Sequence, residues 1–295
     1  MNVYVRKMLE STDRMYRSWM ERKSVDFRCP ENVEIISDIP YLADGNRCHL
    51  MDIYRPTGVK GPLPVLIDLH GGGLVLCSKE VNRPFCAELA RRGFLVFCVD
   101  YPLIPQTDVC GILRDVCVAM DRVGELVETY GGDPERIYLA GDSAGAFLGV
   151  YAVAAAREPL VAAAAGVKPS RTEIRAMALI SGMFYTNLSD STGICLRKDF
   201  YGRNPRQHPL WPWLSPDRPE IAGVMPPCWL VTSKADQLRF QTLRFCRGLK
   251  NVGLKYSITD IPFHPRYGHD FMIMNPNDPK VSELIDGMCR FLASA

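Results

Sequence analysis

The chain has 295 residues, of which 47% are hydrophobic and 23% are charged, and its formal net charge is +2. This composition is typical of a globular protein and excludes a disordered one. The near-neutral charge and the lack of a block of like charges argue against a nucleic-acid partner.

The cysteines and the apolar stretches of the sequence indicate in which cellular compartment the protein is located. The 11 cysteines are scattered, with no C-x-x-C pair and no Cys/His cluster at zinc spacing, so we expect free thiols and no metal site. The charged N-terminus lacks the apolar core of a signal peptide, and no apolar stretch is long enough to span a bilayer. These features predict a cytoplasmic protein without stable membrane association.

The chain begins with a predicted amphipathic helix at 5–23, which we expect to pack on its own protein rather than on a membrane surface. Strands follow at 33–39 and 49–54. Further strands are predicted at 64–69, 94–99, 136–140, 177–180, 229–232 and 256–261. Helical patterns lie at 112–126 and 144–156, and a last helix begins near Asp278 and Pro279.

Apolar strands that alternate with amphipathic helices predict an α/β fold with a mostly parallel sheet covered on both faces. The stretch 183–224 breaks this pattern, because it is rich in proline, arginine, aspartate and aromatic residues without a clean period. We predict an insertion there, over the carboxyl ends of the strands where open α/β sheets bind ligands.

The strongest local motif is Gly141-Asp142-Ser143-Ala144-Gly145, a G-x-S-x-G sequence between a predicted strand and a predicted helix. A sharp turn there would hold the Ser143 hydroxyl clear of the sheet, at the positive end of the following helix. A glycine-rich turn with an incidental serine is the alternative, but the strand–helix context favours a nucleophile.

A serine nucleophile needs a general base and an acid that orients it, which follow the serine in this fold. Two histidines come after the last predicted strand, His264 and His269. We favour His269, because the preceding Gly268 gives it loop freedom. For the acid we favour Asp236, which follows the 229–232 strand, over Asp260 and over a role of Asp236 as a helix N-cap.

The developing oxyanion also needs hydrogen-bond donors. His70-Gly71-Gly72-Gly73 follows the 64–69 strand, and consecutive glycines let backbone N–H groups face a ligand without side chains in the way. The N–H of Ala144, directly after the nucleophile, would complete the oxyanion hole. A merely flexible turn is the alternative.

Taken together, these motifs resemble the hormone-sensitive-lipase-like esterases over about residues 45–293. The motifs occur in that family's order: His70-Gly71-Gly72-Gly73, Asp100-Tyr101-Pro102, Gly141-Asp142-Ser143-Ala144-Gly145, Asp236-Gln237-Leu238 and His269-Asp270-Phe271. The family usually has the segment Asp-Tyr-Arg-Leu-Ala-Pro-Glu, and in this sequence Pro102, Ile104 and Gln106 replace its Arg, Ala and Glu. In addition, Ala146 stands where a further glycine is common.

The resemblance implies an α/β-hydrolase fold with a helical cap. The cap would comprise 1–42 and 183–224, and the catalytic core 43–182 and 225–295. The implied triad is Ser143, Asp236 and His269, with Gly72, Gly73 and Ala144 as oxyanion donors and Gly71 left open. The implied activity is hydrolysis of short-acyl carboxylic esters without a cofactor.

The substrate is a small-molecule ester in this interpretation. Its pocket could be lined by four aromatic residues of the insertion, although a satellite core inside the cap explains them equally well: Phe184, Tyr185, Trp211 and Trp213. Two alternatives are a sugar or xenobiotic O-deacetylase with the same triad and a non-catalytic small-molecule receptor. Association of identical chains is left open.

Overall fold

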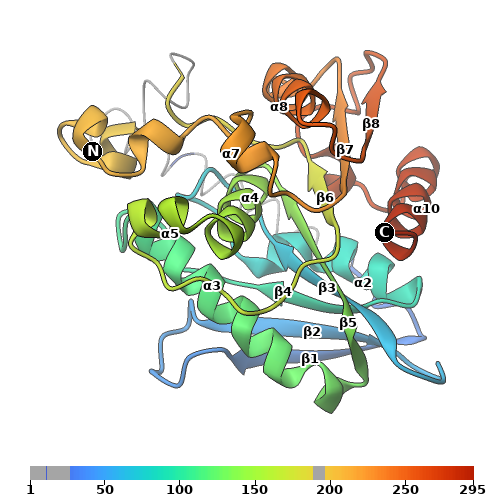
Figure 1. The fold of residues 1–295 in the computed structure, drawn as a ribbon. Helices are drawn as coiled ribbons and strands as arrows, with labels where there is room; N and C mark the ends of the chain where they lie inside the picture. The colour runs from blue at the N-terminus through green and yellow to red at the C-terminus, as the bar shows by residue number, and fades with distance from the viewer. Residues whose placement is uncertain (1–10, 12–26, 189–196) are drawn as a thin grey trace.

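The computed structural model describes residues 11, 27–188 and 197–295. An eight-stranded sheet runs through it in the order β1-β2-β4-β3-β5-β6-β7-β8 (Figure 1). The β1/β2 and β2/β4 pairs are antiparallel, and the remaining pairs are parallel. The prediction of an α/β fold with a mostly parallel sheet is therefore confirmed.

The strands are β1 (Val33–Pro40), β2 (Leu50–Pro56), β3 (Leu63–Leu69), β4 (Leu95–Val99), β5 (Gly132–Asp142), β6 (Met177–Ile180), β7 (Cys228–Ser233) and β8 (Tyr256–Ile261). The α-helices include α2 (Arg83–Arg91), α3 (Val109–Leu126), α4 (Ala144–Arg157), α5 (Pro159–Ala165), α7 (Pro219–Ala222), α8 (Arg239–Asn251), α9 (Phe271–Met274) and α10 (Pro279–Ala293). Short 3-10 turns include η1 (Lys79–Asn82) before α2 and η4 (Trp211–Trp213) in the predicted insertion.

Successive strand residues point to opposite sides of the sheet, so a fully apolar strand presents an apolar surface on both faces. Helices cover both of these faces. Val65 and Ile67 of β3 join the core under α3, α4 and α8, whereas Leu66 joins the core under α2, α9 and α10. The same alternation directs Asp68 toward α2, where it is buried.

All the predicted strands form. Their observed ends lie within a few residues of the predicted ones, and β5 is longer than predicted, from Gly132 to Asp142. The last helix begins at Pro279, and the Asp278 side chain accepts from the N–H groups of Lys280 and Val281, as an N-cap does. The helix predicted at 5–23 lies outside the described residues, apart from Ser11.

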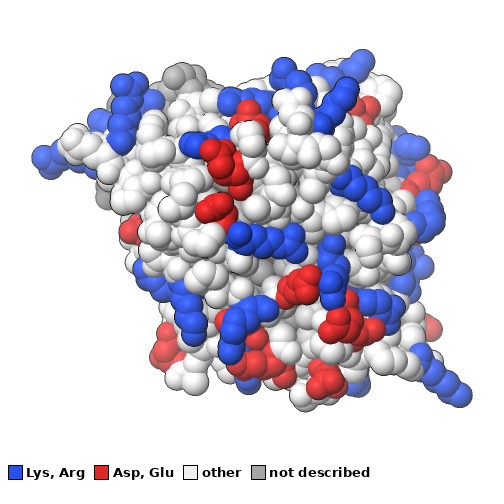
Figure 2. All heavy atoms as spheres, viewed as in Figure 1, with Lys and Arg blue, Asp and Glu red and all other residues white. Residues whose placement is uncertain are grey.

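Charged side chains of both signs are interspersed on the face shown in Figure 2. Elsewhere in the described residues, charged side chains form ion pairs at the surface, such as Arg175 with Glu135 and Arg136 with Asp133. Among the described residues, no helix combines the length and the apolar character that crossing a membrane requires. The ten cysteines in this part of the chain form no disulfide with one another.

Two glycines allow α4 to start directly on the sheet. A Cβ atom on Gly145 would overlap the Leu69 carbonyl oxygen, and one on Gly141 would lie 2.5 Å from the Gly145 carbonyl carbon. Both contacts are with backbone, so a larger residue would have to displace a strand or the helix. This close approach fixes the turn between β5 and α4.

We predict that Gly145→Ala lowers the free energy of unfolding by about 1–3 kcal/mol, because its methyl group overpacks the β3 end. The matched control is Gly287→Ala in α10, where the nearest atom to an added Cβ is 3.9 Å away. That substitution should stabilise the helix by about 0.5–1 kcal/mol. Urea unfolding measures both changes, and equal effects of the same sign would contradict the packing argument.

Candidate active site

Ser143 lies in the turn between β5 and α4 with φ +47° and ψ −111°. A positive φ is uncommon for a residue with a side chain, and here the turn is held from both sides. The Ser143 N–H donates to the Ile180 carbonyl, and its own carbonyl accepts from the Met183 N–H. The hydroxyl is thereby presented at the N-terminus of α4.

Three side chains that are distant in sequence meet at this turn. The Ser143 Oγ lies 2.9 Å from His269 Nε2, and His269 Nδ1 lies 2.9 Å from Asp236 Oδ1. Asp236 follows β7, and its carboxylate also accepts from the Leu238 N–H and the Thr232 hydroxyl. The carboxylate is thus fixed in position by groups other than the imidazole.

Charge and burial act in opposite directions at this contact. Burial alone would raise the pKa of Asp236, but the hydrogen bond with His269 and its charge hold that pKa below its usual value. Burial alone would lower the pKa of His269, but the neighbouring charge of Asp270 and the hydrogen bond with Asp236 raise it. The site therefore favours a protonated imidazole.

The competing residues lie elsewhere. His264 accepts from the Arg266 N–H and packs against the Tyr267 ring. Asp260 is paired with Arg239 through two hydrogen bonds. Within the described part of the chain, no hydrogen bond joins the His264 or Asp260 side chain to the triad.

The glycine loop after β3 is held in place by contacts of His70, the residue that precedes the glycines. His70 is buried and lies 3.1 Å from Asp100 Oδ1, its ring stacks on Tyr101 at 4.2 Å, and the Tyr101 hydroxyl donates to its carbonyl. Gly72 and Gly73 have φ +106° and +62°. Positive φ at Gly72 is combined with a close approach of the Leu76 carbonyl, so this position requires glycine.

The four aromatic residues of the predicted pocket are packed as follows. Phe184 and Tyr185 are fully buried, with Phe184 stacked on Phe245 and the Arg244 guanidinium over the Tyr185 ring. Trp211 contacts the Tyr201 ring by its edge, and Arg218 lies over Trp213. Such contacts fit a satellite core, and a role in binding an acyl group stays a prediction.

Several polar residues near the site were missed by the sequence reasoning. Asp270 lies 3.1 Å from His269 Nε2, and Asn82 donates to both Asp68 and Asp142. Asp142 and Asp270 stand next to the predicted nucleophile and base, which was the only signal in the sequence. Their burial depends on backbone turns that no local pattern predicts.

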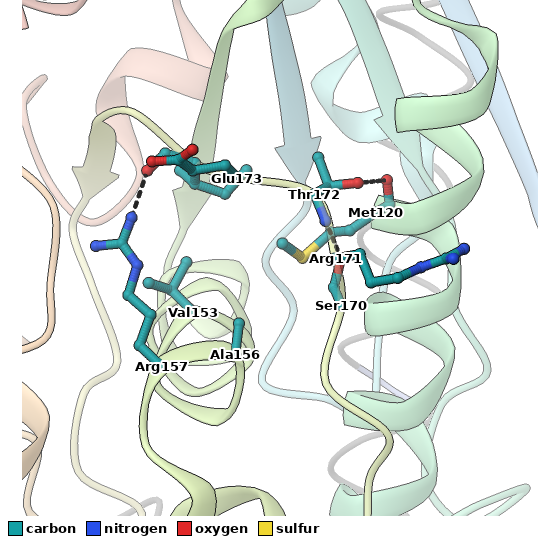
Figure 3. Close-up of a pocket in the computed structure, with 9 residues that line it drawn as sticks. Met120, Val153, Ala156, Arg157, Ser170, Arg171, Thr172 and Glu173 are labelled. Carbon is teal, nitrogen blue, oxygen red and sulfur yellow. Dashed lines mark hydrogen bonds between the residues drawn. The ribbon is translucent and has the colours of Figure 1, made fainter.

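A separate surface hollow lies between α3, α4 and the segment before β6 (Figure 3). It is lined by Arg157 and Thr172 among others, and both donate to backbone carbonyls, of Ile174 and Met120 respectively. Arg157 ends α4, whereas Ser143 precedes its first residue. The hollow is therefore at the other end of this helix from the candidate active site.

A family model described as the alpha/beta hydrolase fold matches residues 66–273. The chain therefore belongs to the α/β hydrolases, and the predicted fold class is confirmed. Within them it belongs to the hormone-sensitive-lipase-like carboxylesterase family that its motifs predicted. Esterase B from Lactobacillus Rhamnosis has the same fold, with a TM-score of 0.90 at 20% identity over 99% of this chain and 95% of that one.

Some relatives match most of this chain at lower identity, and others match about a third of it at higher identity. Carboxylesterase NlhH from Mycobacterium tuberculosis is 28% identical over 225 residues, which cover 71% of this chain and 68% of that protein. The probable isoprenylcysteine alpha-carbonyl methylesterase ICME from Oryza sativa is 37% identical over 103 residues, or 35% of this chain. That match spans 25% of the plant protein's length.

We predict that Tyr101→Phe destabilises the glycine loop. The substitution leaves the buried His70 carbonyl without the donor that lies 2.6 Å away, which costs about 1–3 kcal/mol. Chemical denaturation measures the loss. Tyr138→Phe is the matched control, because the Tyr138 hydroxyl makes no hydrogen bond within the described structure; an equal loss in both variants would contradict the anchoring role.

Proposed function

We propose that the protein is a serine carboxylesterase in which Ser143 is the nucleophile, His269 the general base and Asp236 the residue that orients the base. The observation that carries this proposal is the continuous run of hydrogen bonds from Ser143 Oγ through His269 to Asp236, each of 2.9 Å. The resemblance of the chain to carboxylesterases supports it.

The proposed reaction is acyl transfer in two steps. His269 takes the proton of Ser143 as Oγ attacks the ester carbonyl, and the leaving alcohol then receives that proton. Water deacylates the enzyme by the same route. The N–H groups of Gly72, Gly73 and Ala144 would hold the oxyanion, and none of them donates to another of the described residues. The N–H of Ala144 begins a helix and has no intrahelical acceptor.

The cap is proposed to consist of the N-terminal segment 1–42 and the insertion 183–224. Residues 33–40 of the first segment form β1, so its cap role would fall to the residues before that strand. The Met183 N–H donates to the Ser143 carbonyl, and the Tyr151 hydroxyl of α4 donates to the Trp213 carbonyl. The first contact holds the chain after β6 beside the nucleophile, and the second holds the insertion against α4, which supports a cap there.

We further propose a cytoplasmic location, which is supported by the lack of a disulfide among the ten described cysteines. No cofactor is proposed, since the chemistry needs only side chains and water.

The proposed substrates are short-acyl esters. A screen over acyl lengths from acetyl to hexanoyl, acetylated sugars and a prenylcysteine methyl ester would separate a general carboxylesterase from an O-deacetylase and from the activity named for the plant relatives. A fluorophosphonate probe separates an enzyme from a receptor, because an active hydrolase is labelled at Ser143 and a receptor without catalytic chemistry is not.

We predict that Ser143→Ala lowers the kcat for nitrophenyl acetate by about six orders of magnitude, as in triads whose members act as a unit. His269→Gln should have a comparable effect. The control is His264→Gln, which should retain activity because His264 makes no hydrogen bond to Ser143. Hydrolysis that persists unchanged in Ser143→Ala would refute the assignment.

We also predict an alkaline pH dependence. The base must be neutral to accept the proton of Ser143, and the carboxylates beside His269 raise its pKa above the ordinary 6.5. Therefore kcat/KM should still be rising with pH above 6.5. A pH–rate profile checks this, and a plateau already reached at about pH 6 would contradict it.

A further inference from the structure

A second carboxyl group faces the catalytic imidazole. Asp270 Oδ2 lies 3.1 Å from His269 Nε2, the same nitrogen that contacts Ser143 Oγ at 2.9 Å. Nε2 therefore has two oxygen neighbours on different chain segments. The Asp270 Oδ1 atom is buried without a hydrogen-bond partner in the described part of the chain.

The backbone holds Asp270 in this position. Its φ of +54° and ψ of +27° place it in the left-handed region, which aspartate tolerates better than most residues. Its N–H donates to the Ser181 hydroxyl, and its carbonyl accepts from the N–H groups of Ile273 and Met274. The carboxyl group is thus directed to His269 by the turn that begins α9.

The surroundings of Asp270 are rich in buried carboxyl groups. Asp68, Asp142, Asp236 and Asp270 are all at most 6% exposed. Asn82 donates to Asp142 at 2.8 Å and to Asp68 at 2.9 Å. Among the described residues, the one basic side chain that forms an ion pair with any of these four groups is His269.

Four buried carboxylates with one imidazolium as their counter-charge would be a costly arrangement. The site therefore disfavours the ionisation of all four groups together. Burial raises the pKa of Asp68, of Asp142 and of Asp270, and the charge of Asp270 adds to the effect on Asp142. Asp236 and Asp270 are the two carboxyl groups of this set that contact His269 directly, so they are the ones placed to share its proton.

We propose that Asp270 is a positioning residue that holds one proton jointly with His269 and so sets the pH above which Ser143 can be activated. This inference rests on the proposed esterase function. Below that pH the shared proton lies between Nε2 and Oδ2 and occupies the lone pair that Ser143 needs. When it is released to solvent, Nε2 accepts the Ser143 proton and later passes it to the leaving alcohol.

The test is the pH profile of kcat/KM for nitrophenyl acetate in Asp270→Asn. The amide keeps the shape of the side chain and removes its charge, so the acidic limb should move down by at least about one pH unit. The control is Asp260→Asn, which breaks a partly exposed pair with Arg239 and should leave the limb in place. An unmoved limb in folded Asp270→Asn overturns the inference.

A measurement on the unaltered chain covers the case in which Asp270→Asn does not fold. The ring resonances of His269, assigned by comparison with His269→Gln, should titrate above the ordinary value of 6.5 in NMR spectra; an ordinary histidine titration would overturn the inference. If Ser143→Ala loses activity but the acidic limb does not move in Asp270→Asn, the role of Asp270 is refuted and the esterase proposal stands. Activity retained in Ser143→Ala defeats the esterase proposal itself.

Discussion

The close approach of α4 to the ends of β3 and β5 is the constraint on which the site depends. Gly145 lies against the Leu69 carbonyl, and Gly141 lies against Gly145, so the chain must turn sharply between them. Ser143 takes its positive φ in that turn. The same packing brings the glycine loop after β3 beside the nucleophile, since Gly71 approaches the Asp142 side chain.

Much of this arrangement could be predicted from the sequence, because it follows from local patterns. The apolar runs of β3, β4 and β5 predict buried parallel strands, and G-x-S-x-G between a strand and a helix predicts the turn at Ser143. Chain order then restricts the base to residues after the last strand. His269 meets Ser143 because β8 ends at the same edge of the sheet as β5.

The remaining features depend on tertiary contacts that have no local pattern. Asp270 is an ordinary acid in the sequence, and only its left-handed backbone conformation directs it to His269. Asn82 ends the 3-10 turn before α2, well separated in sequence from the two aspartates that it joins. Likewise, nothing in the sequence decides whether Phe184 and Tyr185 pack in a core or line a pocket; both are fully buried here.

A crystal structure of the protein after reaction with an alkyl phosphonate ester would test the central claim most directly. We expect a covalent bond from phosphorus to Ser143 Oγ, with the phosphoryl oxygen about 3 Å from the N–H groups of Gly72, Gly73 and Ala144. An adduct on another residue, or a phosphoryl oxygen turned away from these donors, would contradict the account.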